Sequence, residues 1–138
     1  MTQRGGQGLV ESGQSLTEFA ISITFVLILL AGIVDLGRAF FVLISLQDAA
    51  QEGAAYAAIA PTDTTGIRQR VRQGSGSAFD VADLTDSQID ILVTGSACAG
   101  NSVKLTLEYD FEFLAPFAAG KTLPLRAEII DRILQPPC

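Results

Sequence analysis

The sequence predicts an α+β fold: a long N-terminal α-helix followed by a short helix and a small antiparallel three-stranded sheet, which packs on the upper part of the long helix. Three observations lead to this expectation. An apolar run of helical composition begins at Phe19 and extends to Leu46. From residue 88 onwards apolar residues recur at every second position, as in strands. A sheet this small needs a cover for its apolar face, and the long helix offers one.

The composition argues against several classes of function. Nine basic against fifteen acidic residues give a net charge of −6, whereas a nucleic-acid partner requires a basic face. The chain has no His, the commonest general base and a common metal ligand. The acidic residues between Asp80 and Asp90 lack the spacing of a calcium-binding loop. We therefore expect no enzyme activity, no cofactor, no metal site and no nucleic-acid partner.

The N-terminal sixty residues divide into a leader and a helix. Residues 1–13 are polar and Gly-rich, and we expect a disordered leader. The long helix follows over 14–60, with a transmembrane segment at about 19–46. At 1.5 Å per residue such a helix is roughly 65–70 Å long, whereas a bilayer core needs only about 20 residues. The helix should therefore continue beyond the membrane.

Two charged residues interrupt the apolar run. Asp35 and Arg38 are three positions apart and hence neighbours on one helix face. Two interpretations stay open. The pair either marks the end of the span at the membrane interface, or lies buried as a charge pair among packed helices.

The remaining chain predicts a connector and a head. Residues 61–87 begin at Pro61, which ends the long helix, and contain a short helix over about 65–73. Residues 88–138 form the head, with strands within 88–95, 102–113 and 121–130 separated by turn residues. In the third strand we expect the inward side chains to be Leu123, Leu125, Ala127 and Ile129. Pro124 predicts an edge position or a bulge.

The two cysteines lack the spacing of a metal or redox motif. In an exported head, a disulfide between Cys98 and Cys138 is plausible. It would close a loop of about 40 residues, worth roughly 4 kcal/mol in the chain-entropy model. Free thiols and an intermolecular link stay open as alternatives.

Glu18 stands at the very start of the apolar run, where a carboxylate is costly unless it is near the interface, protonated or paired. A cut between Gly13 and Gln14 would create a free amine about one turn from this carboxylate. Glu18 of one subunit could then meet the amine of a neighbour, and that pairing would favour one register between packed helices.

The block "GQSLTEFAISITFVLILLAGIVDLGRAFF", followed by "QDAAQEGAAYAA", resembles the TadE-like proteins of the Tad (Flp, type IVb) pilus system. The shared features are a Gly followed after four residues by Glu18–Phe19, the apolar helix and the Ala-rich continuation. The resemblance covers about residues 12–60. It implies that Gly13 and Gln14 flank a prepilin peptidase cut and that Glu18 and Phe19 serve helix register and assembly.

The resemblance also implies a membrane precursor that is processed and then assembled. The precursor would be a single-pass protein of the inner membrane, with its leader in the cytoplasm, its head outside and lipid around its helix. Its partners would be prepilin peptidase, the inner-membrane Tad assembly platform and other pilin subunits. The assembled form would belong to an extracellular pilus. Two alternatives stay open: a membrane-retained assembly factor and a membrane-anchored extracellular binding module.

Overall fold

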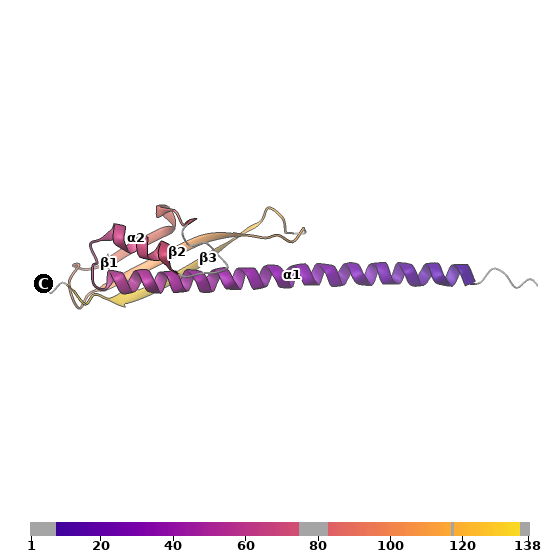
Figure 1. Ribbon diagram of the computed structural model, residues 1–138, viewed down its shortest axis with the longest axis horizontal. Coiled ribbons are helices and arrows are strands. Elements are labelled where there is room, and N and C mark those ends of the chain that lie inside the picture. Colours follow the sequence, from indigo (N-terminus) through magenta and orange to yellow (C-terminus); the bar gives the residue numbers. More distant parts are fainter. Residues whose placement is uncertain (1–7, 75–82, 117, 136–138) are drawn as a thin grey trace, which may run out of the picture.

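The computed structural model describes residues 8–74, 83–116 and 118–135, and its side chains from Gly13 onwards. Its elements confirm the α+β fold: one long helix, one short helix and a three-stranded antiparallel sheet (Figure 1). They are α1 (Gly8–Ala57), α2 (Thr64–Gln73), the short 3₁₀ helix η2 (Asp86–Gln88), β1 (Ile89–Thr94), β2 (Ser102–Glu112) and β3 (Thr122–Arg132).

Helix α1 is longer at its start than the sequence predicted. It begins at Gly8, so residues 8–13 are helical, and the expectation of a disordered leader is wrong for that stretch. It ends at Ala57, before the predicted end at residue 60. The carbonyl of Ala58 is taken by the C-terminal segment, because the backbone N–H groups of Leu134 and Gln135 donate to it at 2.7 and 3.3 Å.

Helix α2 confirms the short helix expected at about 65–73. Asp63 caps its N-terminus by accepting a hydrogen bond from the Gly66 N–H at 2.9 Å. The pKa of Asp63 is lowered, first by this backbone N–H and then by the Tyr56 hydroxyl, which donates to Oδ2 at 2.8 Å. Ile67 and Val71, one turn apart, form the buried face of the helix.

The sheet has the order β1–β2–β3, with β2 in the centre. Leu105 of β2 lies opposite Ile91 on one side and Ile129 on the other. β3 is an edge strand and carries Pro124, which agrees with the expected edge position. Of the side chains expected to point inward from β3, Ala127 is buried, but Leu123 is 43% exposed, because the edge strand has a neighbour on one side only.

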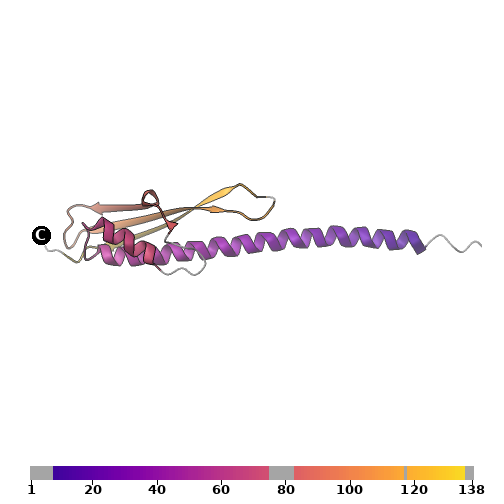
Figure 2. The ribbon, with the colours of Figure 1, turned by 45° about the horizontal axis from the view of Figure 1, so that its top comes forward.

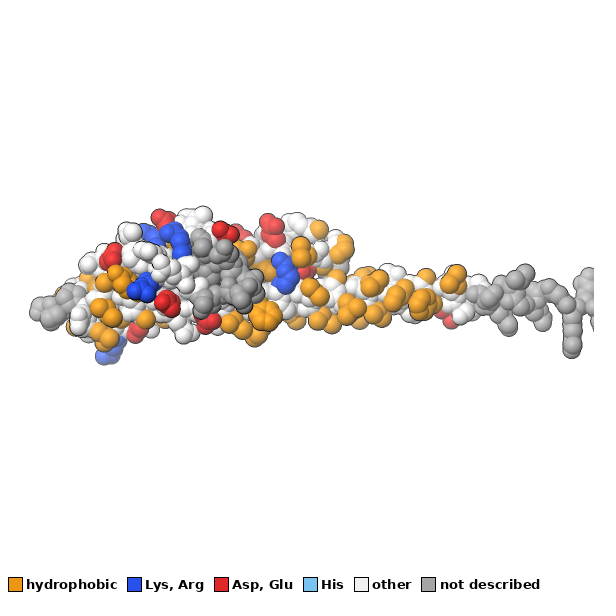
Figure 3. Space-filling model, viewed as in Figure 1, with side chains coloured by type: hydrophobic (Ala, Val, Ile, Leu, Met, Phe, Trp, Pro, Cys, Tyr) orange, Lys and Arg blue, Asp and Glu red, His pale blue; other side chains and the backbone are white. Residues whose placement is uncertain are grey.

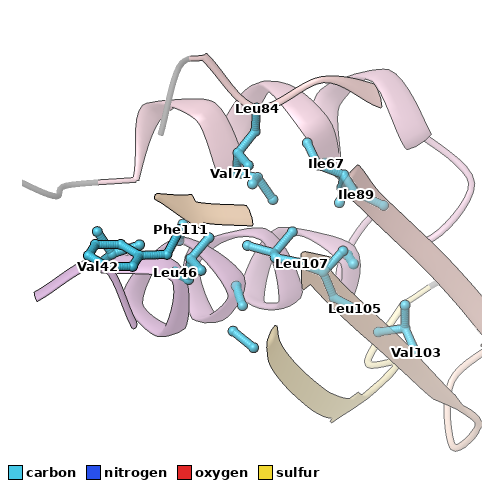
Figure 4. Packing of buried hydrophobic residues seen from close by; sticks show 14 of the residues in the cluster. Val42, Leu46, Ile67, Val71, Leu84, Ile89, Val103, Leu105, Leu107 and Phe111 are labelled. Atoms are coloured by element: carbon cyan, nitrogen blue, oxygen red, sulfur yellow. The ribbon is translucent and has the colours of Figure 1, made fainter. Parts of the chain in front are cut away.

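The core lies where the second half of α1 meets α2 and the sheet (Figure 4). At the centre of this core, α1 contributes small residues. A Cβ added at Gly53 would lie only 2.7 Å from Leu105 Cδ2 and would also collide with Val71 Cγ2. This absence of bulk lets α2 and β2 approach the same stretch of α1. The larger buried side chains around it include Leu46, Ile67, Val71, Leu105, Leu107 and Phe111.

Candidate membrane and assembly helix

The first half of α1 projects away from the head as a single bare helix (Figures 1 and 2). Nearly every side chain from Gly13 to Val34 is exposed. The large apolar residues among them point in all directions, and hydrophobic atoms cover this part of the rod in Figure 3. A helix that is apolar all round is stable only within lipid or among other apolar helices.

The length of this bare segment matches a membrane. From Gly13 to Val34 it extends for about 33 Å at 1.5 Å per residue, and the hydrocarbon core of a bilayer is about 30 Å thick. α1 is the one helix in the described part of the chain that is long and apolar enough to cross a membrane.

The apolar residues further along α1 have a different role. Ala39, Val42 and Leu46 are buried beneath the head and belong to its core. Phe40 and Phe41, on the other face, stay exposed. The predicted transmembrane segment at about 19–46 therefore includes residues that pack in the core of the head, because core packing and lipid both select apolar side chains and the sequence does not distinguish them. Its boundaries stay a prediction.

The residues expected at the cut and at the register contact lie at the exposed end of this segment. Gly13, Gln14, Glu18 and Phe19 are all exposed. Within the chain, the Gln14 side chain donates a hydrogen bond from Nε2 to Glu18 Oε1 at 3.3 Å. No basic side chain in the described residues forms an ion pair with Glu18. Its carboxylate is therefore accessible to a group from another molecule.

Asp35 marks the place where the head begins to cover α1. Its side chain is buried, at 3% exposure, and accepts backbone hydrogen bonds from Leu114 at 3.2 Å and Ala115 at 2.8 Å. Arg38 Nη1 lies 3.3 Å from Asp35 Oδ1, and its guanidinium stands 5.2 Å from the centre of the Phe111 ring. Asp35 thus lies at the end of the bare segment and is paired with Arg38, and the structure adds a third contact that neither interpretation included. Asp35 fastens the β2–β3 turn to α1.

The contact between Asp35 and this turn had no signal in the sequence. Leu114 and Ala115 follow Asp35 by 79 and 80 positions and use only their backbone N–H groups. A backbone donor is the same for nearly every residue type, so no side-chain pattern identifies it.

Comparison with known proteins bears on this helix. Residues 13–55 match the family model described as TadE-like protein. Over these residues the N-terminal helix is similar to TadE-like proteins. The match begins at Gly13 and ends just before α1 does, so it contains the bare segment, Glu18 and Asp35 but none of the sheet. No curated protein and no solved structure matches the chain.

The match confirms the resemblance to TadE-like proteins read from the sequence, over the N-terminal helix. Together with the apolar helix it indicates a single-pass membrane protein.

Beyond the TadE-like segment, the arginines of α2 are engaged within the molecule. Arg72 pairs with Asp86 and donates from Nε to the Leu84 carbonyl at 3.0 Å. Arg70 lies 3.8 Å from Glu52 of α1. These contacts hold α2 between the TadE-like helix and the segment leading into the sheet.

The cysteines lie in the part of the chain beyond the TadE-like segment. Cys98 is in the β1–β2 connection and is not a free thiol. Cys138 lies outside the described residues, so the Cys98–Cys138 disulfide stays a prediction.

Proposed function

We propose that the protein is a pilin-like structural subunit of a Tad (Flp, type IVb) pilus, which polymerises through its N-terminal helix after prepilin peptidase cuts between Gly13 and Gln14. The single observation that carries this proposal is the bare segment of α1. It is apolar on all sides and continues without a break into the helix that supports the head. Such a segment is stable in lipid before assembly and among identical helices after it.

In the precursor the bare segment spans the inner membrane. The leader lies on the cytoplasmic side, where the peptidase and the assembly platform act, and the head lies outside. Because α1 runs unbroken from the span into the head, a pull on the helix moves the folded head with it. Extraction into a fibre therefore requires no unfolding of the head.

Glu18 provides the register in this scheme. Among the described residues, its carboxylate accepts one side-chain hydrogen bond, from the amide of Gln14. The cut would expose the amine of Gln14 four residues away, and a small axial stagger would bring Glu18 of one subunit to the amine of the next. The pairing neutralises two charges that are costly in an apolar fibre core.

The test is the intact mass of the protein, measured separately in sheared surface material and in membranes. We expect a chain that begins at Gln14 in the sheared material, allowing for loss of ammonia if the terminal glutamine cyclises. A chain with an intact leader, found only in membranes, would replace the pilin with a membrane-retained assembly factor. A cut chain that stays in the membrane and binds a surface ligand would indicate an anchored binding module.

A further inference from the structure

The turn between β2 and β3 is apolar at a place where hairpin turns are usually polar. Residues 113–119 read FLAPFAA, whereas Gly, Asn, Asp and Ser dominate turns alongside Pro. We call the described residues of this turn, 113–116 and 118–120, the hairpin tip. Leu114 is 69% exposed, and Pro116 and Ala119 are exposed as well. The tip therefore presents apolar side chains that nothing in the described chain covers.

The hairpin tip points along α1 towards the bare segment (Figures 1 and 2). Asp35 holds it there through the backbone of Leu114 and Ala115. A shallow apolar groove of about 250 Å³ separates tip and helix, lined mainly by Leu30, Ala31, Val34, Leu114, Ala115 and Pro116. The tip thus overlaps the end of the segment that matches a membrane.

The length of the span puts the tip at the membrane boundary. The bare segment, which spans the membrane in the proposed precursor, ends at Val34. The tip lies beside residues 30–35, so it lies within about 6 Å of that end at 1.5 Å per residue. Apolar side chains of interfacial segments enter membranes to about this depth.

Four of the six backbone N–H groups in the described residues of the tip are hydrogen-bonded, those of Phe113, Leu114, Ala115 and Ala118, which lowers the cost of placing this turn beside lipid. Asp35 accepts two of its N–H groups, and Pro116 has none to satisfy. Further hydrogen bonds within the turn join Phe113 N–H to the Lys121 carbonyl, Ala118 N–H to the Ala115 carbonyl and Lys121 N–H to the Ala118 carbonyl, at 3.4, 2.9 and 3.0 Å.

Basic side chains flank the tip. Arg38 and Lys121 are both exposed at its base. Long basic side chains keep their charge at the headgroups while their stems lie along apolar surface. An apolar tip with a largely hydrogen-bonded backbone and flanking cations suits a membrane-interface anchor.

We propose that the hairpin tip is a second membrane contact of this protein, inserted into the outer leaflet beside α1. It would set the depth of the head and prevent its rotation about the helix while the precursor waits in the membrane. The inference rests on the membrane-spanning precursor of the proposed function. It predicts that extraction into a fibre must withdraw two apolar elements, the helix and the tip.

The chain contains no Trp, so single Trp substitutions report on one position each. The full chain carrying Leu114→Trp would be reconstituted into phosphatidylcholine vesicles with bromine either near the headgroups or near the chain ends. Ile33→Trp on the bare helix and Leu92→Trp on exposed β1 serve as references. We expect Leu114→Trp to be blue-shifted and to lose most of its emission to the shallow bromines. Ile33→Trp should be quenched too, and Leu92→Trp should stay bright and accessible to iodide.

Each other outcome is informative. Quenching of Ile33→Trp without quenching of Leu114→Trp would overturn the tip contact and leave the spanning helix intact. Absence of quenching at both positions would overturn the membrane precursor itself. Protection of Leu114→Trp from iodide that grows with protein density, without bromine quenching, would assign the tip to a second copy of the chain and reject lipid. Ala119→Trp repeats the test at a second exposed position outside the core.

Discussion

At the scale of single residues, two aspartates organise the joints of the molecule by the same chemistry. Asp63 accepts the N–H of Gly66 and so starts α2, and Asp35 accepts the N–H groups of Leu114 and Ala115 and so holds a distant turn. Each satisfies backbone donors that would otherwise lack a partner, at the start of a helix or at the tip of a hairpin.

Asp35→Asn should loosen the hairpin tip without unfolding the head. An amide has one acceptor oxygen where the carboxylate offers two, so one of the two backbone donors loses its partner and the attraction of Arg38 disappears. Amide hydrogen exchange should quicken at Leu114 and Ala115 and stay unchanged in β2. Asp48→Asn, at an exposed position on the same helix, is the control and should leave hydrogen exchange unchanged both at the tip and in β2. Unchanged exchange at the tip in Asp35→Asn would refute the fastening role.

Asp63 should make the stability of the head depend on pH. Its pKa is lowered in the folded chain from the ordinary value of 3.8, so the carboxylate stabilises the fold above that value and the contribution is lost as pH falls through the folded pKa. Asp63→Asn keeps a capping side chain but does not titrate. The difference in urea midpoint between the two proteins should therefore shrink as pH falls below about 4. A difference independent of pH would contradict the assignment.

At the scale of elements, α1 has two halves with the same apolar character and different neighbours. The first half exposes bulky apolar side chains, whereas the second packs mainly small residues against α2 and the sheet and exposes Phe40 and Phe41 together with polar residues. The small residues allow α2 and β2 to pack closely against the same short stretch of α1. A larger side chain there would collide with side chains of α2 and β2, as a Cβ on Gly53 would with Val71 and Leu105.

Gly53→Ala tests this close approach. The added methyl gains about 0.5–1 kcal/mol of helix propensity, but overpacking against Val71 and Leu105 costs about 1–3 kcal/mol. We expect a net loss of about 1 kcal/mol in the free energy of unfolding, measured by urea with tyrosine fluorescence in detergent. Gly37→Ala on the same helix meets nothing within 4 Å and should be neutral or slightly stabilising. Equal effects of the two substitutions would argue against a tight contact at Gly53.

At the scale of the whole molecule, the protein is a rod with a head along one end, and its two apolar surfaces lie on the same side of the head. The bare segment of α1 and the hairpin tip both face away from the C-terminal end of the helix (Figure 1). The acidic head, by contrast, carries most of the charge. This polarity suits a protein that moves from a membrane into a fibre with its head kept in water.

Glu18→Gln should separate membrane insertion from assembly. Removing the charge leaves the apolar span intact, so the protein should still insert and be cut, but the register contact with the amine of a neighbour is lost. We expect the cut protein to accumulate in membranes and to fall to a small fraction of its normal amount in sheared surface material. Asp48→Asn, which removes the charge of an exposed acid in the second half of α1, is the matched control. Normal filaments from Glu18→Gln would reject the register mechanism.

The sequence by itself determined the α+β class, the helix and strand periods, the apolar span and the TadE-like resemblance. These follow from local patterns, because side chains on one face of a helix or strand recur at a fixed spacing along the sequence. The edge position of Pro124 belongs here too.

Tertiary packing alone shows where exposed apolar residues of α1 give way to core residues, and which groups Asp35 binds. An apolar side chain looks alike in either environment, so the boundary depends on where the head comes to rest. The partners of Asp35 are backbone N–H groups some eighty residues away, which carry no side-chain signature. Both the boundary on α1 and the partners of Asp35 depend on long-range packing, because packing determines which distant parts of the chain come into contact.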